Sequence, residues 1–217
     1  MIERLIYHIS PKKVNYTMNK IDTILREAKG KILTREDFDS LATKYNFERD
    51  TLRKVMLNKG YLITIFRGVY YLKSYEEKKF NSLRYSPYEL LALGLEKKRI
   101  KWYFGLNTAL KFLNLTHEVF PLNIVINDKF NRTKPMKIAG SSFFFIKLKP
   151  SLFFALKETK TSNNTCFYYS SLEKTLLDMI YLKKNVELKE YKFNKHVFLK
   201  ESSKYNRIVK KKIKEMI

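Results

Sequence analysis

Five polar side chains between residues 49 and 58 have the chemistry and the spacing to contact DNA; they are Arg49, Thr51, Arg53, Lys54 and Asn58. Arginine can donate two hydrogen bonds to the O6 and N7 atoms of guanine, and asparagine can pair in a similar way with adenine. An apolar stripe at helical spacing leaves these side chains on the outer face of a helix predicted over 48–58. We therefore predict that Lys54 holds a phosphate while the other four side chains face the major groove.

The elements before and after this helix follow the order of a winged helix-turn-helix domain. Thr34 with Asp37 forms a weak capping box at the start of a preceding amphipathic helix. Asn46 is predicted to end that helix and to cap the next one, which Gly60 then stops. Two amphipathic helices joined by a short turn are thus expected over about 35–58.

A β-hairpin is predicted to follow the second helix. The β-branched and aromatic runs 62–66 and 69–72 flank Arg67-Gly68, which is a tight-turn signal. Arg67 would lie at the tip of this wing, against a phosphate or in a minor groove, and Arg35 would hold another phosphate. Ile32-Leu33 is expected to be a short strand that pairs with the wing. Because any small α+β domain can contain two such helices and a hairpin, a domain without DNA contact is the alternative.

The composition indicates a globular chain with a polyanionic partner. Hydrophobic residues make up 45% of the 217 residues, and the formal net charge is +23. Residues 1–75 contain 15 Lys and Arg against 8 Asp and Glu, residues 76–160 contain 16 against 7, and residues 161–217 contain 13 against 6. Either the whole chain lies along nucleic acid, or its second half meets another acidic partner. Codon bias of an AT-rich genome would account for part of the lysine excess.

The residue types typical of catalytic and metal sites are few and scattered. His8, His117 and His196 are far apart in the sequence and do not combine with Cys166 into a zinc site. Cys166 is the single cysteine, and we expect it to be a buried structural thiol. No catalytic residue, metal ligand or cofactor is predicted.

Two acidic–lysine pairs leave a metal-dependent nuclease as an alternative. Asp128-Lys129 is one pair, and Glu173-Lys174 with Asp178 is the other. Such pairs also arise by chance in a chain that is 30% charged. We interpret Glu173 as the capping-box partner of Ser170 at the start of a helix, and Asp178 as a residue of its polar face.

The chain is predicted to be an α+β protein with a winged helix-turn-helix domain and a mixed C-terminal domain. Its segments are an N-terminal arm (1–16), the winged helix-turn-helix (17–74, with a first helix over 19–28), a linker (75–85) and a C-terminal α+β domain (86–217). In the last segment, helices are expected over 87–97, 106–113, from Ser170 onward and over 204–217, and strands over 123–127, 137–138, 142–148 and 166–169. We interpret the last helix as docked with a solvated lysine face; a nucleic-acid-binding or partner-binding tail is the alternative.

Three motifs of the chain resemble those of a known family. They are Gly60-Tyr61-Leu62 with Arg67-Gly68-Val69-Tyr70, the segment Tyr103–Leu110, and SLEKTLLD at Ser171–Asp178. In this order the chain resembles the AbiEi antitoxins of abortive-infection systems, over most of residues 17–182. The resemblance implies that the winged helix binds inverted repeats in double-stranded DNA of its own promoter and represses its operon. It also implies that the second domain counteracts a nucleotidyltransferase-like toxin encoded alongside, without enzymatic activity of its own.

A stand-alone winged-helix transcription factor, whose second domain senses a ligand or dimerises, is the remaining alternative. The first residues lack the apolar core of a signal peptide. No apolar run approaches the roughly 20 residues that span a bilayer. We therefore expect a cytoplasmic protein with no membrane partner.

Overall fold

The computed structural model describes residues 11–118 and 120–216, and the chain forms two compact units with a boundary between Ser86 and Pro87. Each unit combines helices with a β-sheet, which confirms the predicted α+β class. Residues 1–10 of the predicted N-terminal arm lie outside the described part of the chain, whereas residues 11–16 belong to the first helix. In the part of the chain that is described, no helix has both the length and the apolar character to cross a membrane.

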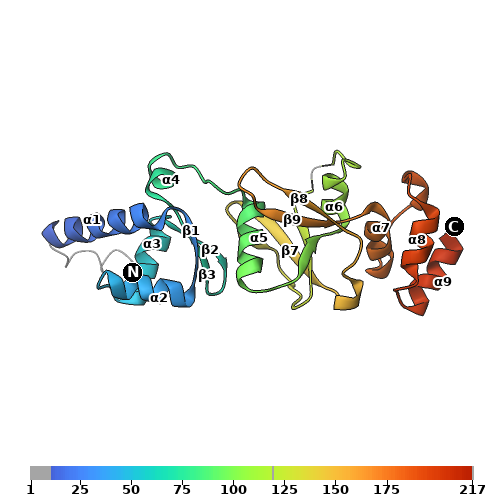
Figure 1. The fold of residues 1–217 in the computed structure, drawn as a ribbon, viewed down its shortest axis with the longest axis horizontal. Coiled ribbons are helices and arrows are strands. Elements are labelled where there is room, and N and C mark those ends of the chain that lie inside the picture. Colours follow the sequence, from blue (N-terminus) through green and yellow to red (C-terminus); the bar gives the residue numbers. More distant parts are fainter. Residues whose placement is uncertain (1–10, 119, 217) are drawn as a thin grey trace. The chain divides into compact units, whose positions relative to one another are not determined.

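The first unit contains helices and a small sheet in the predicted order (Figure 1). Its elements are α1 (Pro11–Ala28), β1 (Lys31–Thr34), α2 (Arg35–Lys44), α3 (Arg49–Asn58), β2 (Leu62–Phe66), β3 (Val69–Leu72) and α4 (Tyr75–Lys79). Helix α1 begins eight residues before the predicted start, because the prediction followed the apolar stripe that begins at Ile21. Pro11 suits the first helical turn, where its missing N–H leaves no hydrogen bond unmade.

The three strands of this unit form an antiparallel sheet in the order β1-β3-β2. Thr34 pairs with Val69, and Leu62 pairs with Leu72, so β1 lies beside the hairpin as predicted. The hairpin turn is at Arg67-Gly68, where Gly68 has a φ of 78°. This left-handed backbone favours glycine at the turn.

The predicted linker 75–85 is wrong in its first half, because α4 occupies Tyr75–Lys79. Ser74 and Glu77 form a capping box at its start. The Glu77 carboxylate is buried and accepts hydrogen bonds from the Tyr71 hydroxyl at 2.6 Å and from the backbone N–H of Arg84 at 2.7 Å. Lys78 of α4 also forms an ion pair with Asp22 of α1, 56 residues away, at 2.5 Å, so α4 is part of the first unit. A prediction from local hydrophobic periodicity does not detect this contact.

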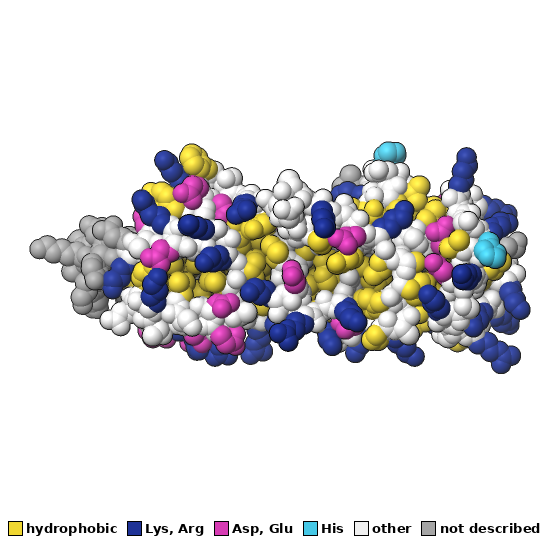
Figure 2. All heavy atoms as spheres, in the orientation of Figure 1, with side chains coloured by type: hydrophobic (Ala, Val, Ile, Leu, Met, Phe, Trp, Pro, Cys, Tyr) yellow, Lys and Arg dark blue, Asp and Glu magenta, His cyan; other side chains and the backbone are white. Residues whose placement is uncertain are grey.

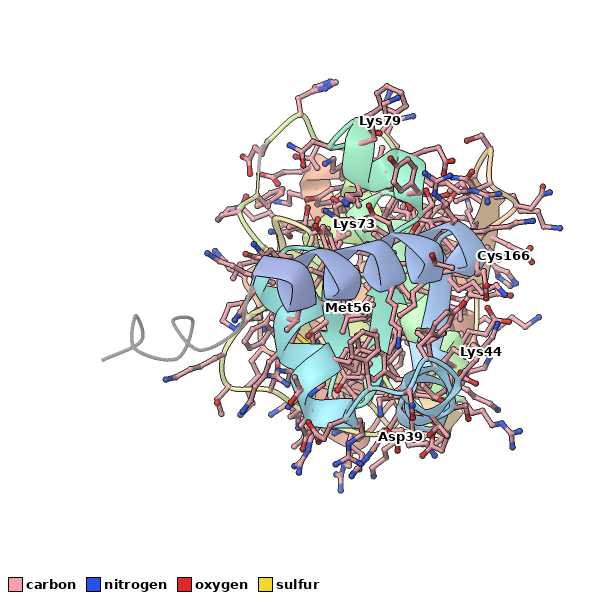
Figure 3. The ribbon with its side chains drawn as sticks, turned by 90° about the vertical axis from the view of Figure 1, so that its left-hand side faces the viewer. Asp39, Lys44, Met56, Lys73, Lys79 and Cys166 are labelled. Atoms are coloured by element: carbon pink, nitrogen blue, oxygen red, sulfur yellow. The ribbon has the colours of Figure 1, made fainter. Side chains whose placement is uncertain are left out.

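The core of the first unit lies between the three longer helices and the sheet. Its fully buried members include Ile21 and Ile24 of α1, Phe38 of α2 and Met56 of α3. Figure 3 views this unit with α1 in front and Met56 behind it. α2 and α4 lie on opposite sides of α1, as Figures 1 and 3 both show. Because Leu52 and Met56 of α3 are buried in this core, the opposite side of α3 faces the solvent.

The second unit is built on a six-stranded mixed sheet in the order β6-β7-β5-β4-β9-β8. Its strands are β4 (Trp102–Phe104), β5 (Asn123–Asn127), β6 (Met136–Ile138), β7 (Ser141–Lys147), β8 (Leu156–Lys160) and β9 (Cys166–Ser170). Its helices are α5 (Pro87–Lys97), α6 (Leu106–Phe112), α7 (Leu172–Tyr181), α8 (Lys195–Ser202) and α9 (Arg207–Met216), with short 3-10 turns at Pro150–Leu152 and Leu188–Glu190. The four predicted strands are present within one residue of their expected ends.

Strands β4 and β8 and helix α8 were not predicted from the sequence. β4 has only three residues, and β8 is a polar edge strand with the sequence LKETK. Neither length nor alternation therefore distinguishes them from loops. They owe their strand conformation to pairing, β4 with β5 and β9, and β8 with β9.

The two faces of this sheet are covered by different helices (Figure 1). Tyr103 and Ile126 lie in one core cluster with Leu176 of α7 and Val209 of α9. On the other face the ring of Tyr88 from α5 contacts Phe104, Phe143 and Phe167, with ring centroids 5.5–6.4 Å apart. Tyr205, Val209 and Ile213 are buried, which confirms that the last helix is docked.

Candidate nucleic-acid interface

The residues predicted to contact DNA come from three elements of the first unit. Arg35 opens α2, Arg67 lies in the β2–β3 turn, and the remaining five belong to α3. Five of the seven are exposed: Arg35, Thr51, Lys54, Asn58 and Arg67. In the described part of the chain, none of the three cations in this group takes part in an ion pair within 4.0 Å.

The start of α2 lies against the hairpin turn. A Cβ atom added to Gly68 would be 3.9 Å from the Cβ of Arg35. The pairing of Thr34 with Val69 places Arg35 next to Arg67 and Gly68 by continuing the same register. Two exposed guanidinium side chains therefore start from neighbouring points of the backbone.

The two arginines of α3 are held by carboxylates rather than standing free. Arg49 Nη1 lies 3.5 Å from Asp39 Oδ2 of α2, and Arg49 Nε lies 3.4 Å from Asp50 Oδ1. Arg53 Nε lies 3.7 Å from the same Asp50 oxygen. Both arginine side chains are only partly exposed, at 39% and 37%. The sequence predicts both arginines on the outer face of α3 but does not predict this network, which joins α2 to α3.

Glu48 caps α3, so the prediction that Asn46 does so is wrong. The Glu48 carboxylate accepts the backbone N–H groups of Asp50 at 3.0 Å and of Thr51 at 2.6 Å. A side-chain hydrogen bond from Thr51, followed by these two backbone bonds, lowers the pKa of Glu48 from 4.5 to about 2. Asn46 instead adopts a left-handed φ of 58° in the turn between the helices. A longer acidic side chain thus takes the role that is more common for asparagine.

On the face of the molecule that Figure 2 shows, basic side chains are not gathered in one place. In Figure 2, lysine and arginine side chains are scattered over the visible face of both units, with acidic side chains between them. Net charge alone therefore does not mark an interface on this face.

A second cluster of charged side chains is buried inside the second unit. Lys174 and Asp178 of α7 form an ion pair in which both side chains are 0% exposed. Lys174 Nζ donates to the hydroxyls of Tyr103 at 3.0 Å and Tyr205 at 2.9 Å. These hydroxyls in turn donate to Asp178, at 2.8 Å from Tyr103 and 2.7 Å from Tyr205. The four side chains connect α7 to β4 and to the segment between α8 and α9.

This cluster corrects the interpretation of the acidic residues in α7. Asp178 is fully buried and does not lie on a polar face. The helix is capped by Ser171, whose hydroxyl accepts the N–H of Lys174 at 3.2 Å, and not by Ser170. Glu173 accepts the backbone N–H of Asn194 at 3.0 Å and is not a capping-box partner.

Burial sets the protonation tendencies within the cluster. Loss of hydration lowers the pKa of the Lys174 ammonium and raises the pKa of the Asp178 carboxyl, and their mutual attraction opposes both changes. Both carboxylate oxygens of Asp178 already accept hydrogen bonds from side chains of the cluster. The arrangement is that of a satisfied internal network.

The remaining residues considered for chemistry lie apart from one another. His117 and His196 are exposed, and His8 lies outside the described residues. Cys166 is partly exposed and not buried as predicted, because it lies in the β8–β9 pair at the edge of the sheet. A hydrogen bond with Glu158 raises the pKa of its thiol. Among the described residues, no three His, Cys, Asp or Glu side chains converge as metal ligands would.

Asp128 is engaged at the end of β5. Its Oδ1 accepts the backbone N–H of Lys101 at 3.2 Å, and its Oδ2 lies 3.6 Å from Lys129 Nζ. Asp128 and Asp178 therefore each have a structural partner.

Comparison with known proteins adds no relative: neither the models of protein families nor the curated proteins contain a match to this chain. The functional argument therefore rests on the residues themselves.

Proposed function

We propose that this protein is a sequence-specific DNA-binding regulator whose first unit is a winged helix-turn-helix domain. The observation that carries the proposal is the order α1-β1-α2-α3-β2-β3 with strand order β1-β3-β2, and exposed polar and basic residues on α3 and at the hairpin turn. In winged helix-turn-helix domains, the second helix of the pair enters the major groove.

In this proposal α3 is the recognition helix. Thr51 and Asn58 are exposed on it, and Asn58 has the amide that pairs with adenine in a major groove about 12 Å wide. Arg49 and Arg53 exchange their carboxylate partners for base edges. Lys54 holds a phosphate beside the groove.

Arg35 and Arg67 bind the backbone next to the wing in this arrangement. Their neighbouring positions at the start of α2 and at the hairpin turn suit successive phosphates or a narrow minor groove. Because they have no ion-pair partner in the described part of the chain, their charge is available to the polyanion.

The resemblance to AbiEi antitoxins extends the proposal to the biological role. We infer that the operator is double-stranded DNA with inverted repeats upstream of the protein's own gene. The second unit would then counteract a nucleotidyltransferase-like toxin. Its fully satisfied Lys174–Asp178 network supports a role in holding that unit together rather than a catalytic role.

Binding of the full chain to its own upstream DNA and to random DNA, across a salt series and with or without magnesium, tests the proposal. We expect preference for the upstream DNA and no cleavage. Equal affinity for both sequences would refute sequence-specific recognition, and magnesium-dependent cleavage would support the nuclease alternative. Rescue of cells that express the neighbouring toxin gene tests the antitoxin role separately.

Two substitutions in α3 distinguish contacts to base edges from contacts to phosphates. Arg53→Ala should weaken specific binding by roughly 1–3 kcal/mol and relax one base preference, whereas Lys54→Ala should weaken binding to all sequences alike. Lys79→Ala is the matched control, because it removes one exposed charge from α4, on the other side of α1 from α2 (Figure 3). Equal losses on specific and random DNA for both α3 variants would remove α3 as the recognition helix.

A further inference from the structure

Four side chains of alternating charge form a continuous chain across α2 and α3. Asp39 contacts Arg49, Arg49 contacts Asp50, and Asp50 contacts Arg53, at separations of 3.5, 3.4 and 3.7 Å. The two positive and two negative charges cancel. We call this set the Asp–Arg relay.

The contacts of the relay are weak enough to be exchanged. Its side chains are 37–50% exposed, and ion pairs at such positions gain little because water screens them. Asp39 Oδ1 is also buried without a hydrogen-bond partner among the described residues, which is an arrangement that costs free energy. The position of Asp39 is therefore better explained by its effect on Arg49 than by a contribution to stability.

We propose that Asp50, with Asp39, is a positioning and specificity-determining residue of the DNA interface. The two carboxylates orient the guanidinium groups of Arg49 and Arg53 and neutralise them until a base edge replaces the carboxylate. This inference rests on the proposed function of the first unit.

The relay makes this part of α3 discriminate against non-specific DNA. Random DNA attracts a protein almost entirely through phosphate contacts that release counterions. A neutralised guanidinium contributes little to that attraction. A guanine edge, by contrast, offers two acceptors in the geometry of the arginine fork, and can replace a carboxylate that is held with only moderate geometry.

The relay also divides the basic residues of the interface by task. Arg35, Lys54 and Arg67 form no ion pair in the described part of the chain and supply the attraction that every DNA sequence shares. Arg49 and Arg53 contribute to binding only where the DNA sequence offers a base edge that replaces their carboxylate partner. Asp50 is the residue that separates the two groups, because a single carboxylate oxygen lies close to both arginines.

Asp50→Asn tests the inference, because it removes the charge and keeps the shape of the side chain. On random DNA, the slope of log affinity against log salt should steepen by about 0.9 for each phosphate contact that a released arginine makes. The ratio of affinities for upstream and random DNA should fall by about fivefold or more, the lower end of the discrimination that one arginine–guanine pair provides.

Asp50 lies in the first turn of α3, where an acidic residue also stabilises the helix. Asp39→Asn is therefore a second variant, because it removes a carboxylate partner of Arg49 without altering that turn. Glu76→Gln on α4 is the control, with the same change in net charge away from the relay, and it should alter neither quantity beyond the general effect of charge. Circular dichroism establishes that each variant is folded.

The outcomes separate the inference from the proposed function. If both Asp variants keep the wild-type salt slope and affinity ratio, the relay has no role in recognition. If wild-type protein shows no preference for its upstream DNA, the proposed function fails. The slope on random DNA then still decides whether the carboxylates neutralise the two arginines.

Discussion

Replacing Lys174 by methionine tests whether the buried cluster stabilises the second unit. Methionine is of similar length but has neither charge nor hydrogen-bond donor. Asp178 would keep the hydroxyl donors of Tyr103 and Tyr205 and lose its counter-charge. Removing one partner of a fully buried ion pair costs about 3–5 kcal/mol, because the remaining charge stays out of water without compensation. We expect the free energy of unfolding to fall by that amount.

The corresponding change in melting temperature follows from the size of the unit. With an unfolding entropy of about 2.1 cal/mol/K per residue and roughly 130 residues, Tm should fall by roughly 11–18 °C. Trp102 is the single tryptophan, is buried, and lies in β4 next to Tyr103. Urea and thermal unfolding of the full chain, followed by tryptophan fluorescence, therefore report on the second unit.

A surface pair with the same spacing provides the control. Lys211 lies 3.9 Å from Glu215, four residues along α9, and is 81% exposed. Lys211→Met should change the free energy of unfolding by less than about 0.5 kcal/mol. The double variant Lys174→Met/Asp178→Asn should recover much of the loss, since no buried charge remains. A loss below about 1 kcal/mol for Lys174→Met, or a double variant equal to the sum of the single ones, would refute the reasoning.

Two further predictions concern a helix cap and a close contact. The lowered pKa of Glu48 contributes stability above about pH 4.5, and this stability is lost as the pH falls towards about 2. In thermal melts, the Glu48→Gln variant should therefore lose less stability than the wild type between pH 5 and pH 3. Equal losses of stability in the two proteins would contradict the capping role. Gly105→Ala should destabilise the second unit by about 1–3 kcal/mol, because the new Cβ would lie 2.3 Å from Cδ1 of buried Ile126. Ile126→Val removes that atom and should reduce the cost of Gly105→Ala in the same fluorescence assay; an unchanged cost would show that the clash is elsewhere.

Local patterns in the sequence were sufficient to predict most elements of the first unit. The stripes of α2 and α3 express a periodicity of 3.6 residues, and the hairpin was indicated by β-branched and aromatic runs on either side of Arg67-Gly68; both signals depend only on neighbouring positions. The capping box of Thr34 and Asp37 was predicted in the same way and is present, with hydrogen bonds of 2.9 and 3.2 Å. In the second unit the apolar runs of β5 and β7 were long enough to be recognised.

Elements and contacts that depend on residues distant in the sequence could not be predicted. α4 belongs to the first unit because Lys78 pairs with Asp22 of α1, 56 residues away, and β8 is a strand because β9 pairs with it. Asp178 was assigned to a polar face, since a charged residue in a helix usually faces water. The i,i+4 spacing of Lys174 and Asp178 was a signal of a pair, but its burial depends on Tyr103, which is 71 residues from Lys174.

For the candidate interface, the sequence is enough to predict which side chains α3 presents, because helical geometry assigns each position to a face. The charges that lie opposite these side chains depend on how α2 and α3 pack together. Arg49 is neutralised by Asp39 across the turn between two packed helices, while Lys54 in the same helix has no such partner in the described residues. Helical periodicity sets the direction of a side chain, whereas the packing of one helix against another sets which charge lies opposite it.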